Sequence, residues 1–134
     1  MILRGRKMYG GVVEGEALVT RQRISGWGGM DPRSGTIIEI GHELRGMCFA
    51  GKILVFPAAK GSSAWSHYFH LARLAGKAPA GLLVGRVCTR SALGAAVLKV
   101  PALTAFDRDP VEAIRTGDRL RVDADAGIVE ILGR

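Results

Sequence analysis

The chain has 134 residues, of which 48% are hydrophobic and 23% are charged, and it carries a net charge of +7. These proportions exclude an intrinsically disordered chain, and no apolar run is long enough to cross a bilayer. The length suits one domain with a sizeable core, so we expect a single domain over residues 1–134. The basic first residues are not followed by an apolar signal core, so we expect a cytoplasmic protein without a membrane partner.

The N-terminal third of the sequence predicts strands and a long loop. Residues 8–20, MYGGVVEGEALVT, alternate small and apolar residues with glutamates, which predicts a pair of strands with glycine turns. Residues 24–46 contain six glycines and an Asp-Pro pair, so we expect mostly loop with a short strand at 36–40. A loop of this length in a small domain often carries function, and the alternative is an irregular surface connection.

The central part of the sequence alternates apolar runs with helical patterns. Ile53, Leu54, Val55 and Phe56 form a continuous apolar run that ends at a proline, which is typical of a buried strand. Apolar residues then recur at helical spacing, and Gly76 follows them, so a helix is predicted from about residue 64 to residue 75. The next predicted elements are a buried strand, a short helix and a further strand, at residues 80–85, 91–98 and 100–106.

The C-terminal part predicts a β-hairpin. A turn or short helix is expected at residues 109–115, which open with an Asp-Pro pair. Residues 118–132, DRLRVDADAGIVEIL, alternate apolar and polar residues on both sides of the turn DADAG. We find no linker and no internal repeat. The order of the elements therefore predicts an α/β mixed fold, a single compact domain in which β and α layers pack together.

The cysteines and the basic residues exclude two classes of site. Cys48 and Cys88 lie far apart and form no Cys-x-x-Cys pair, so we expect two buried thiols and no metal site in this chain. The positive charge would suit nucleic acid, but the basic residues are scattered and aromatic residues make up only 6% of the chain. We therefore expect no nucleic acid partner; a solvated basic surface, or a face for an acidic partner or anionic substrate, explains the charge.

Residues 61–63, Gly-Ser-Ser, fall between a predicted strand and a predicted helix. The free backbone N–H groups and the dipole of a helix N-terminus favour anions there and can stabilise an alkoxide. Ser62 is therefore a candidate general base, and both serines are candidates for binding a carboxylate or a phosphate. Spacing alone favours the simpler explanation, in which Ser63 caps the helix.

Two histidines lie on the helix predicted after these serines. His67 and His70 are three residues apart, a spacing that can chelate a metal, but the sequence offers no third ligand nearby. We expect one of them to be exposed and the other partly buried. A triad of Ser62, His67 and Asp31 can be drawn, but the run does not match the Gly-x-Ser-x-Gly elbow of hydrolases.

Four segments together are similar to a known family. They read GGVVEGEALVT, ISGWGGMDPRSGTIIEIGHELRGMCFAGKILVFPAAKGSS, GKAPAGLLVG and GDRLRVDADAGIVEI. In this order they resemble the swivel domain, or small subunit, of aconitase X over nearly the whole chain. The combination of WGGMDPRSG with KGSS is fairly specific, whereas neither motif is specific alone. The resemblance implies a swivelling β/β/α domain and a hydro-lyase that removes water from a small hydroxy acid.

The resemblance also implies that two subunits share the chemistry. An iron–sulfur cluster is expected in the large subunit, where its iron acts as a Lewis acid on the leaving hydroxyl, and no cofactor is expected in this chain. In aconitase-like enzymes the first serine of a Gly-Ser-Ser motif takes the substrate proton, and that serine matches Ser62. Ser63 is then expected to cap the helix or to bind a substrate carboxylate.

The substrate-binding residues follow from the same resemblance. Those expected to line the site are Gly28, Gly29, Asp31, Gly61 and Ser63. Aconitase-type motifs usually continue Ser-Ser-Arg, and the arginine grips a carboxylate, but this chain has Ala64 instead. The carboxylate contact must then come from another group, for which Arg33, Lys60 and the large subunit are the candidates.

The substrate is the least determined part of the prediction. Known members of the family act on cis-3-hydroxy-L-proline or on mevalonate 5-phosphate. The composition, rich in arginine and alanine and poor in lysine, favours a substrate like cis-3-hydroxy-L-proline, with mevalonate 5-phosphate as the alternative. A phosphate-bearing substrate would suit the basic charge of the chain.

Two other classes of function remain open. The run SAWSHYFHLARLAGKAPAGLL also resembles the phosphohistidine swivelling domain of phosphotransfer enzymes, in which His67 would carry a phosphoryl group. Against this, His67 falls inside the predicted helix, several residues after Gly61. The third class is a non-catalytic binding module that has kept the fold, and the presence of Ser62 argues against it.

Overall fold

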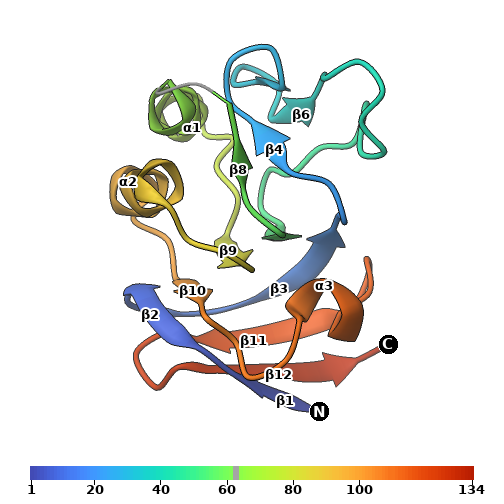
Figure 1. Ribbon diagram of the computed structural model, residues 1–134, viewed down its shortest axis with the longest axis vertical. Coiled ribbons are helices and arrows are strands. Elements are labelled where there is room, and N and C mark those ends of the chain that lie inside the picture. Colours follow the sequence, from blue (N-terminus) through green and yellow to red (C-terminus); the bar gives the residue numbers. More distant parts are fainter. Residues whose placement is uncertain (62–63) are drawn as a thin grey trace.

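The computed structural model describes residues 1–61 and 64–134, and its main feature is a sheet of eight strands (Figure 1). In spatial order the strands are β1 (Ile2–Arg4), β12 (Ile128–Gly133), β11 (Arg119–Asp123), β3 (Val12–Val19), β7 (Ile53–Phe56), β9 (Gly81–Val84), β10 (Ala102–Thr104) and β2 (Arg6–Tyr9). Two small ribbons pair β4 (Ile24–Ser25) with β8 (Ala59–Lys60) and β5 (Met30–Asp31) with β6 (Thr36–Ile37). The helices are α1 (Trp65–Leu74), α2 (Thr89–Leu98) and α3 (Pro110–Ala113).

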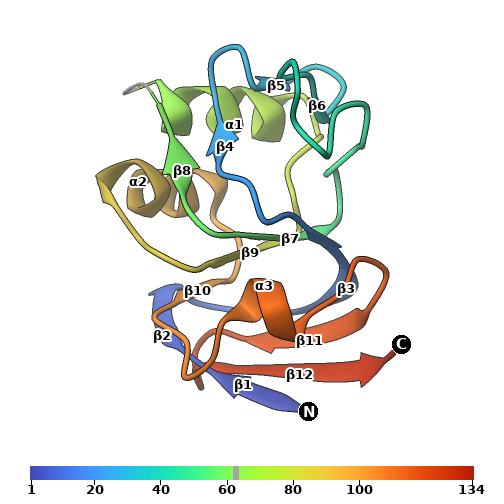
Figure 2. The same cartoon turned by 45° about the vertical axis from the view of Figure 1, so that its right-hand side comes forward.

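The main sheet has a parallel half and an antiparallel half. Strands β3, β7, β9 and β10 run parallel to one another, whereas β3, β11, β12 and β1 pair antiparallel. Helices α1 and α2 lie side by side over the parallel half, and the antiparallel strands form the layer on the opposite side of the molecule (Figure 2). This arrangement gives the β, β and α layers that the sequence predicts.

The continuous apolar run of β7 is explained by burial on both faces. Leu54 and Phe56 belong to a first core beneath α1 and α2, whereas Ile53 and Val55 belong to a second core between the sheet layers. Side chains of a strand alternate between its two faces, so a strand that is covered on both sides must be apolar throughout. All four residues of β7 are fully buried.

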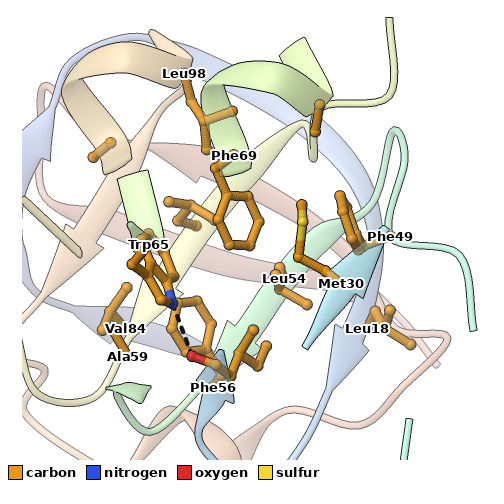
Figure 3. Packing of buried hydrophobic residues seen from close by; sticks show 14 of the residues in the cluster. Leu18, Met30, Phe49, Leu54, Phe56, Ala59, Trp65, Phe69, Val84 and Leu98 are labelled. Atoms are coloured by element: carbon orange, nitrogen blue, oxygen red, sulfur yellow. Dashed lines mark hydrogen bonds between the residues drawn. The ribbon is translucent and has the colours of Figure 1, made fainter. Parts of the chain in front are cut away.

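Aromatic rings dominate the first core (Figure 3). Trp65 is fully buried, and its ring centroid lies 4.4 Å from that of Phe69 and 6.0 Å from that of Phe56. Its indole Nε1 donates a hydrogen bond of 2.8 Å to the carbonyl of Ile24, so the polar end of this buried ring is satisfied. Because Trp65 is the first residue of α1, the same packing fixes where the helix begins.

Most of the predicted elements are present, with several differences. The strand pair predicted within residues 8–20 is wrong: β2 pairs with β10, while β3 is one strand of eight residues between β7 and β11. Strands β1, β4, β5 and β8 were not predicted, the strand predicted at 36–40 is shorter, and α2 begins two residues earlier than expected. The predicted C-terminal hairpin of β11 and β12 and the α/β mixed fold are confirmed. Across residues 1–61 and 64–134, no helix is long and apolar enough to span a membrane.

Candidate active site

The segment between β8 and α1 is the candidate site. Ser62 and Ser63, the predicted base and its neighbour, lie outside the described residues, so the site is built from the residues that flank them. Gly61 follows β8 with φ of +88°, a backbone conformation that residues other than glycine rarely adopt. On the other side, α1 has ten residues, Ala64 as its N-cap and no acidic residue in its first turn. The positive end of this helix dipole is therefore not neutralised by its own carboxylates.

The segment is held at both of its ends. Before it, β8 pairs in parallel with β4, and the Ile24 amide donates to the Ala58 carbonyl at 3.2 Å. After it, Trp65 donates to the carbonyl of the same Ile24. The chain at Gly26 must pass close to the helix, since an added Cβ there would lie 2.8 Å from Trp65 Cα. Strand β4 is thus the common support of β8 and of the start of α1.

A charged cluster lies beside Gly61. Lys60 Nζ donates to Glu39 Oε2 at 3.0 Å, and Ser25 lies opposite Lys60 in the β4–β8 register. Burial opposes the charged form of Glu39, but hydrogen bonds from Lys60 and Ser25 outweigh it and hold the pKa of this carboxyl below its ordinary value. The other carboxylate oxygen, Oε1, is buried and has no hydrogen-bond partner among the described residues. Glu39 is therefore ionised and still has acceptor capacity next to Gly61.

The glycine-rich loop reaches this cluster through Gly29. An added Cβ at Gly29 would lie 2.5 Å from Ser25 Cβ, so only glycine fits against that side chain. The Gly29 carbonyl accepts from the amides of Ile38 at 2.9 Å and Glu39 at 3.3 Å, which brings Glu39 to the site. Gly28 adopts φ of +75° with open space around it.

The carboxylate of Asp31 is occupied within its own turn. Its Oδ1 accepts from the Arg33 amide and its Oδ2 from the Ser34 hydroxyl, both at 3.0 Å. Asp31 therefore shapes the loop, and a direct contact with substrate would require it to leave these partners. Of the residues predicted to line the site, the structure brings Gly29 and Gly61 to Ser25, whereas the side chain of Asp31 turns back into its loop.

The histidines and cysteines that the sequence singled out differ in how exposed they are. His67 is exposed and His70 is half-buried, as predicted. The prediction of two buried thiols is wrong, because Cys48 is exposed and Cys88 is half-buried; both are free. Among residues 1–61 and 64–134, no group of three His, Cys, Asp or Glu side chains is placed to hold a metal ion. Lys60 is available for a carboxylate only in competition with Glu39.

Ser25 and Glu39 are the site residues that sequence reasoning missed. Ser25 lies 35 positions before Lys60 in the chain and Glu39 lies 21 positions before it, so no local spacing reveals the cluster. The only available signal was the length of the glycine-rich loop, which predicted function in general. The pairing of β4 with β8 is what makes these positions neighbours.

Several large apolar side chains are exposed along residues 27–47, the part of the chain that also carries Glu39. Trp27 is 70% exposed and Ile40 is 84% exposed, and both lie within a few residues of Gly29 or Glu39 in the sequence. Ile38, from the same loop, and Met47, which follows it, are also large apolar residues that are exposed. Groups of exposed apolar residues mark surfaces that other proteins cover.

The mixed sheet, the helices over its parallel half and the loop segment that leads into α1 define a swivelling β/β/α domain. A family model described as the aconitase X swivel domain matches residues 2–131. The chain belongs to the aconitase X swivel domain family, as the sequence motifs predicted.

Individual relatives agree with this assignment. The phosphomevalonate dehydratase small subunit of Thermococcus kodakarensis is 42% identical over 98% of this chain and 97% of its own length. The protein of the same name from Methanocella arvoryzae is 38% identical over 98% of this chain and 99% of its own length. The crystal structure of Thermococcus kodakaraensis aconitase X in its holo form matches with a TM-score of 0.93 at 42% identity, covering 98% of both chains. A relative solved by solution NMR matches with a TM-score of 0.89 at 39% identity, covering 98% of this chain and 99% of its own.

Proposed function

We propose that this chain is the small subunit of a hydro-lyase that dehydrates mevalonate 5-phosphate, together with a large subunit. The observation that carries the proposal is the Gly61-Ser62-Ser63 segment between β8 and α1, in a chain whose relatives are named phosphomevalonate dehydratase small subunits. These names favour the phosphorylated substrate over a substrate like cis-3-hydroxy-L-proline, which the composition had favoured. The hydroxyproline substrate is the alternative that the assay below separates.

Ser62 is the proposed general base. It takes the proton from the carbon next to the substrate carboxylate, and the hydroxyl group then leaves from the neighbouring carbon as a double bond forms. The serine must act as an alkoxide for this step, and in this proposal the backbone N–H groups and the dipole at the start of α1 support that charge. No acidic residue in the first turn of α1 opposes this support.

The flanking residues position the base in this proposal. Gly61 provides the turn out of β8, and Trp65 fixes the start of the helix on the other side. Lys60 and Glu39 hold the end of β8 against the glycine-rich loop. Gly28 has open space around it, so a small substrate can approach the backbone there, whereas Gly29 lets the loop pack against Ser25. Ser63 is proposed to bind the substrate carboxylate, because the N-cap position of α1 is Ala64.

The family implies an iron–sulfur cluster, and the described residues of this chain do not fit one. Neither cysteine belongs to a group of three potential metal ligands among residues 1–61 and 64–134. The cluster is therefore assigned to the large subunit in this proposal, and no step of the chemistry is routed through it here. This chain contributes the base and part of the substrate cavity.

The large subunit is proposed to cover the loop that carries Trp27, Ile38, Ile40 and Met47. These side chains are exposed in the part of the chain that also carries Glu39, and we propose that a partner that buries them also closes the site from water. The apolar area provides the driving force for association. The base and the rest of the catalytic machinery would then meet at the subunit interface.

The test is to express the chain with the large subunit of the same organism, purify the complex without oxygen and assay loss of water from mevalonate 5-phosphate and from cis-3-hydroxy-L-proline. We expect turnover of mevalonate 5-phosphate only by the complex. Turnover of hydroxyproline instead would replace the substrate, and turnover by the small chain alone would refute the two-subunit proposal. Labelling of His67 by a phosphoryl donor would favour the phosphotransfer alternative.

A further inference from the structure

We propose that a cavity lined by Arg23, Arg86 and Arg108 binds the phosphate group of the substrate. The cavity has a volume of about 490 Å³ and lies where the chain leaves β7, β9 and β10, so it opens at the carboxyl ends of the parallel strands. Ligands of α/β sheets bind at this edge, because the loops that follow parallel strands converge there. The substrate assignment rests on the proposed function; the binding of phosphate does not.

The charge of the cavity is not balanced by the described part of the protein. None of the three arginines forms an ion pair with a described residue, whereas Arg21 and Arg134 are paired with Glu112 and Asp118. Among the described residues, Asp109 is the one acidic residue that lines the cavity, and its Oδ1 already accepts from the Val111 amide. Three guanidinium groups against one carboxylate leave an excess of positive charge in a concave surface. A guanidinium group matches phosphate oxygens through two parallel hydrogen bonds.

The backbone at Arg23 and Arg86 is fixed. The carbonyl of Arg23 accepts from His42 Nε2 at 3.0 Å, and the Nδ1 of the same buried ring accepts from the Leu44 amide, which sets the tautomer. The amide of Arg86 donates to the Pro57 carbonyl at 2.7 Å, which joins the loop after β9 to the end of β7. Side chains that start from fixed backbone lose less entropy when they bind a ligand.

The backbone before Arg108 is fixed as well. The Asp107 amide donates to the Arg4 carbonyl at 2.8 Å, and Asp107 Oδ1 accepts from the Arg4 amide at 3.0 Å. Two positions earlier, Ala105 has φ of +51°, an uncommon conformation for a residue with a Cβ, and it turns the chain sharply after β10. Arg108 thus follows a turn that is anchored to Arg4, the last residue of β1.

The β4–β8 ribbon connects the cavity to the Gly-Ser-Ser segment. Ile24 and Ala59 pair in the register and are buried in the first core. The residues that alternate with them and face away from this core are Arg23, Ser25, Ala58 and Lys60. Ala58 lines the cavity and lies three residues before Gly61, so their Cα atoms are at most about 11 Å apart. The cavity and Gly61 are therefore joined by one short stretch of the β4–β8 ribbon.

The first experiment tests binding by the full chain alone. The ¹⁵N-labelled chain is titrated with inorganic phosphate at constant ionic strength, with chloride as the reference. We expect saturable shifts of the Gly85, Arg86 and Phe106 amides, and we expect R86Q and R108Q to weaken binding at least about tenfold. R121Q removes one charge from the exposed side of β11 and should bind as the wild type does. Shifts that do not saturate, or that R121Q weakens equally, would overturn the proposal.

The second experiment separates the cavity from the proposed function. In the complex with the large subunit, R86Q and R108Q should raise KM for mevalonate 5-phosphate and leave kcat nearly unchanged, since they remove binding far from the reacting carbon. An unchanged KM in an active complex would overturn the assignment of the cavity to substrate while the dehydratase function stands. Saturable phosphate binding by the chain, with a wild-type complex that dehydrates neither substrate, would overturn the function and leave the phosphate site in place.

Discussion

Trp65 Nε1 donates a hydrogen bond of 2.8 Å to the carbonyl of Ile24, which joins the first residue of α1 to β4. Both residues are buried, so neither group has water as an alternative partner. The position of the start of α1 relative to β4 therefore depends on the hydrogen bond and packing of one indole ring. The same ring touches the region of Gly94 on α2, which makes it the contact point of both helices with the ribbon.

Replacing Trp65 with phenylalanine should lower the free energy of unfolding by about 1–3 kcal/mol, because the hydrogen bond from the indole to the Ile24 carbonyl is lost and a cavity forms. Denaturant unfolding of the isolated chain measures this change. Trp27→Phe makes the same chemical change at a side chain that is 70% exposed and should alter stability by less than about 0.5 kcal/mol. Equal losses in the two variants would contradict the role given to Trp65.

Gly94→Ala should destabilise the chain although alanine is the better helix former. An added Cβ at Gly94 would lie 2.8 Å from Trp65 Cε3 and closer still to Cζ3, and the buried ring has little room to move. The overpacking should cost about 1–3 kcal/mol, which exceeds the gain of about 1 kcal/mol in helix propensity. Thermal unfolding shows whether the substitution stabilises or destabilises the chain. Gly133→Ala, where an added Cβ meets nothing within 4 Å, is the control, and a stabilised Gly94→Ala would refute the packing argument.

The lowered pKa of Glu39 predicts a specific dependence of stability on pH. Burial opposes ionisation, and the hydrogen bonds from Lys60 and Ser25 outweigh it, so the carboxyl ionises more readily in the folded chain. Its contribution is fully present above its ordinary pKa of 4.5 and is lost as the pH falls through the lower folded value. Glu39→Gln should therefore cost up to about 1 kcal/mol at pH 7, and this difference should shrink below pH 4.5.

Unfolding curves between pH 3 and 7 measure this difference, and the Lys60→Met background supplies the control. Without the lysine, the pH dependence of the Glu39→Gln effect should be smaller, because the hydrogen bond from Lys60 is the largest contribution that lowers the Glu39 pKa. If the stability difference between the wild-type chain and the Glu39→Gln variant grew on acidification, the predicted direction of the Glu39 pKa shift would be wrong. A Lys60→Met background with an unchanged pH profile would assign the effect to Ser25 and His42.

The sequence predicted the elements whose signals are local. The apolar run at Ile53–Phe56, the helical spacing after residue 64 and the alternation in 118–132 all produced the expected strand, helix and hairpin. The pairing of β2 with β10 was not predictable, because those strands lie more than 90 residues apart and their partners are chosen by the sheet as a whole. The Lys60–Glu39–Ser25 cluster escaped for the same reason. The family motifs carried the prediction of Ser62, which no spacing argument could separate from a helix cap.

The exposed apolar side chains of the glycine-rich loop should be needed for assembly and not for folding. Ile40→Lys places a charge at a side chain that is 84% exposed, so the isolated chain should keep its stability. If the large subunit covers this loop, the same change should weaken association at least about tenfold, because a buried unpaired charge is costly. Leu132→Lys, at a side chain on β12 that is 45% exposed, is the matched control.

Analytical ultracentrifugation of the mixed subunits measures this association. Normal assembly by Ile40→Lys, or an equal defect in Leu132→Lys, would show that the large subunit docks elsewhere on this chain. A defect confined to Ile40→Lys would support an interface that closes over Glu39 and Gly61.

The most direct test of the central claim is the turnover of mevalonate 5-phosphate by the purified complex that carries Ser62→Ala. We expect the variant to assemble with the large subunit and to lose at least about 100-fold in kcat, since a positioned general base contributes about 10²–10⁴-fold. Ser66→Ala, at the second residue of α1, is the control, and the complex that carries it should keep its activity. Full activity of Ser62→Ala would contradict the account and leave Gly61-Ser62-Ser63 as a helix start without a catalytic base.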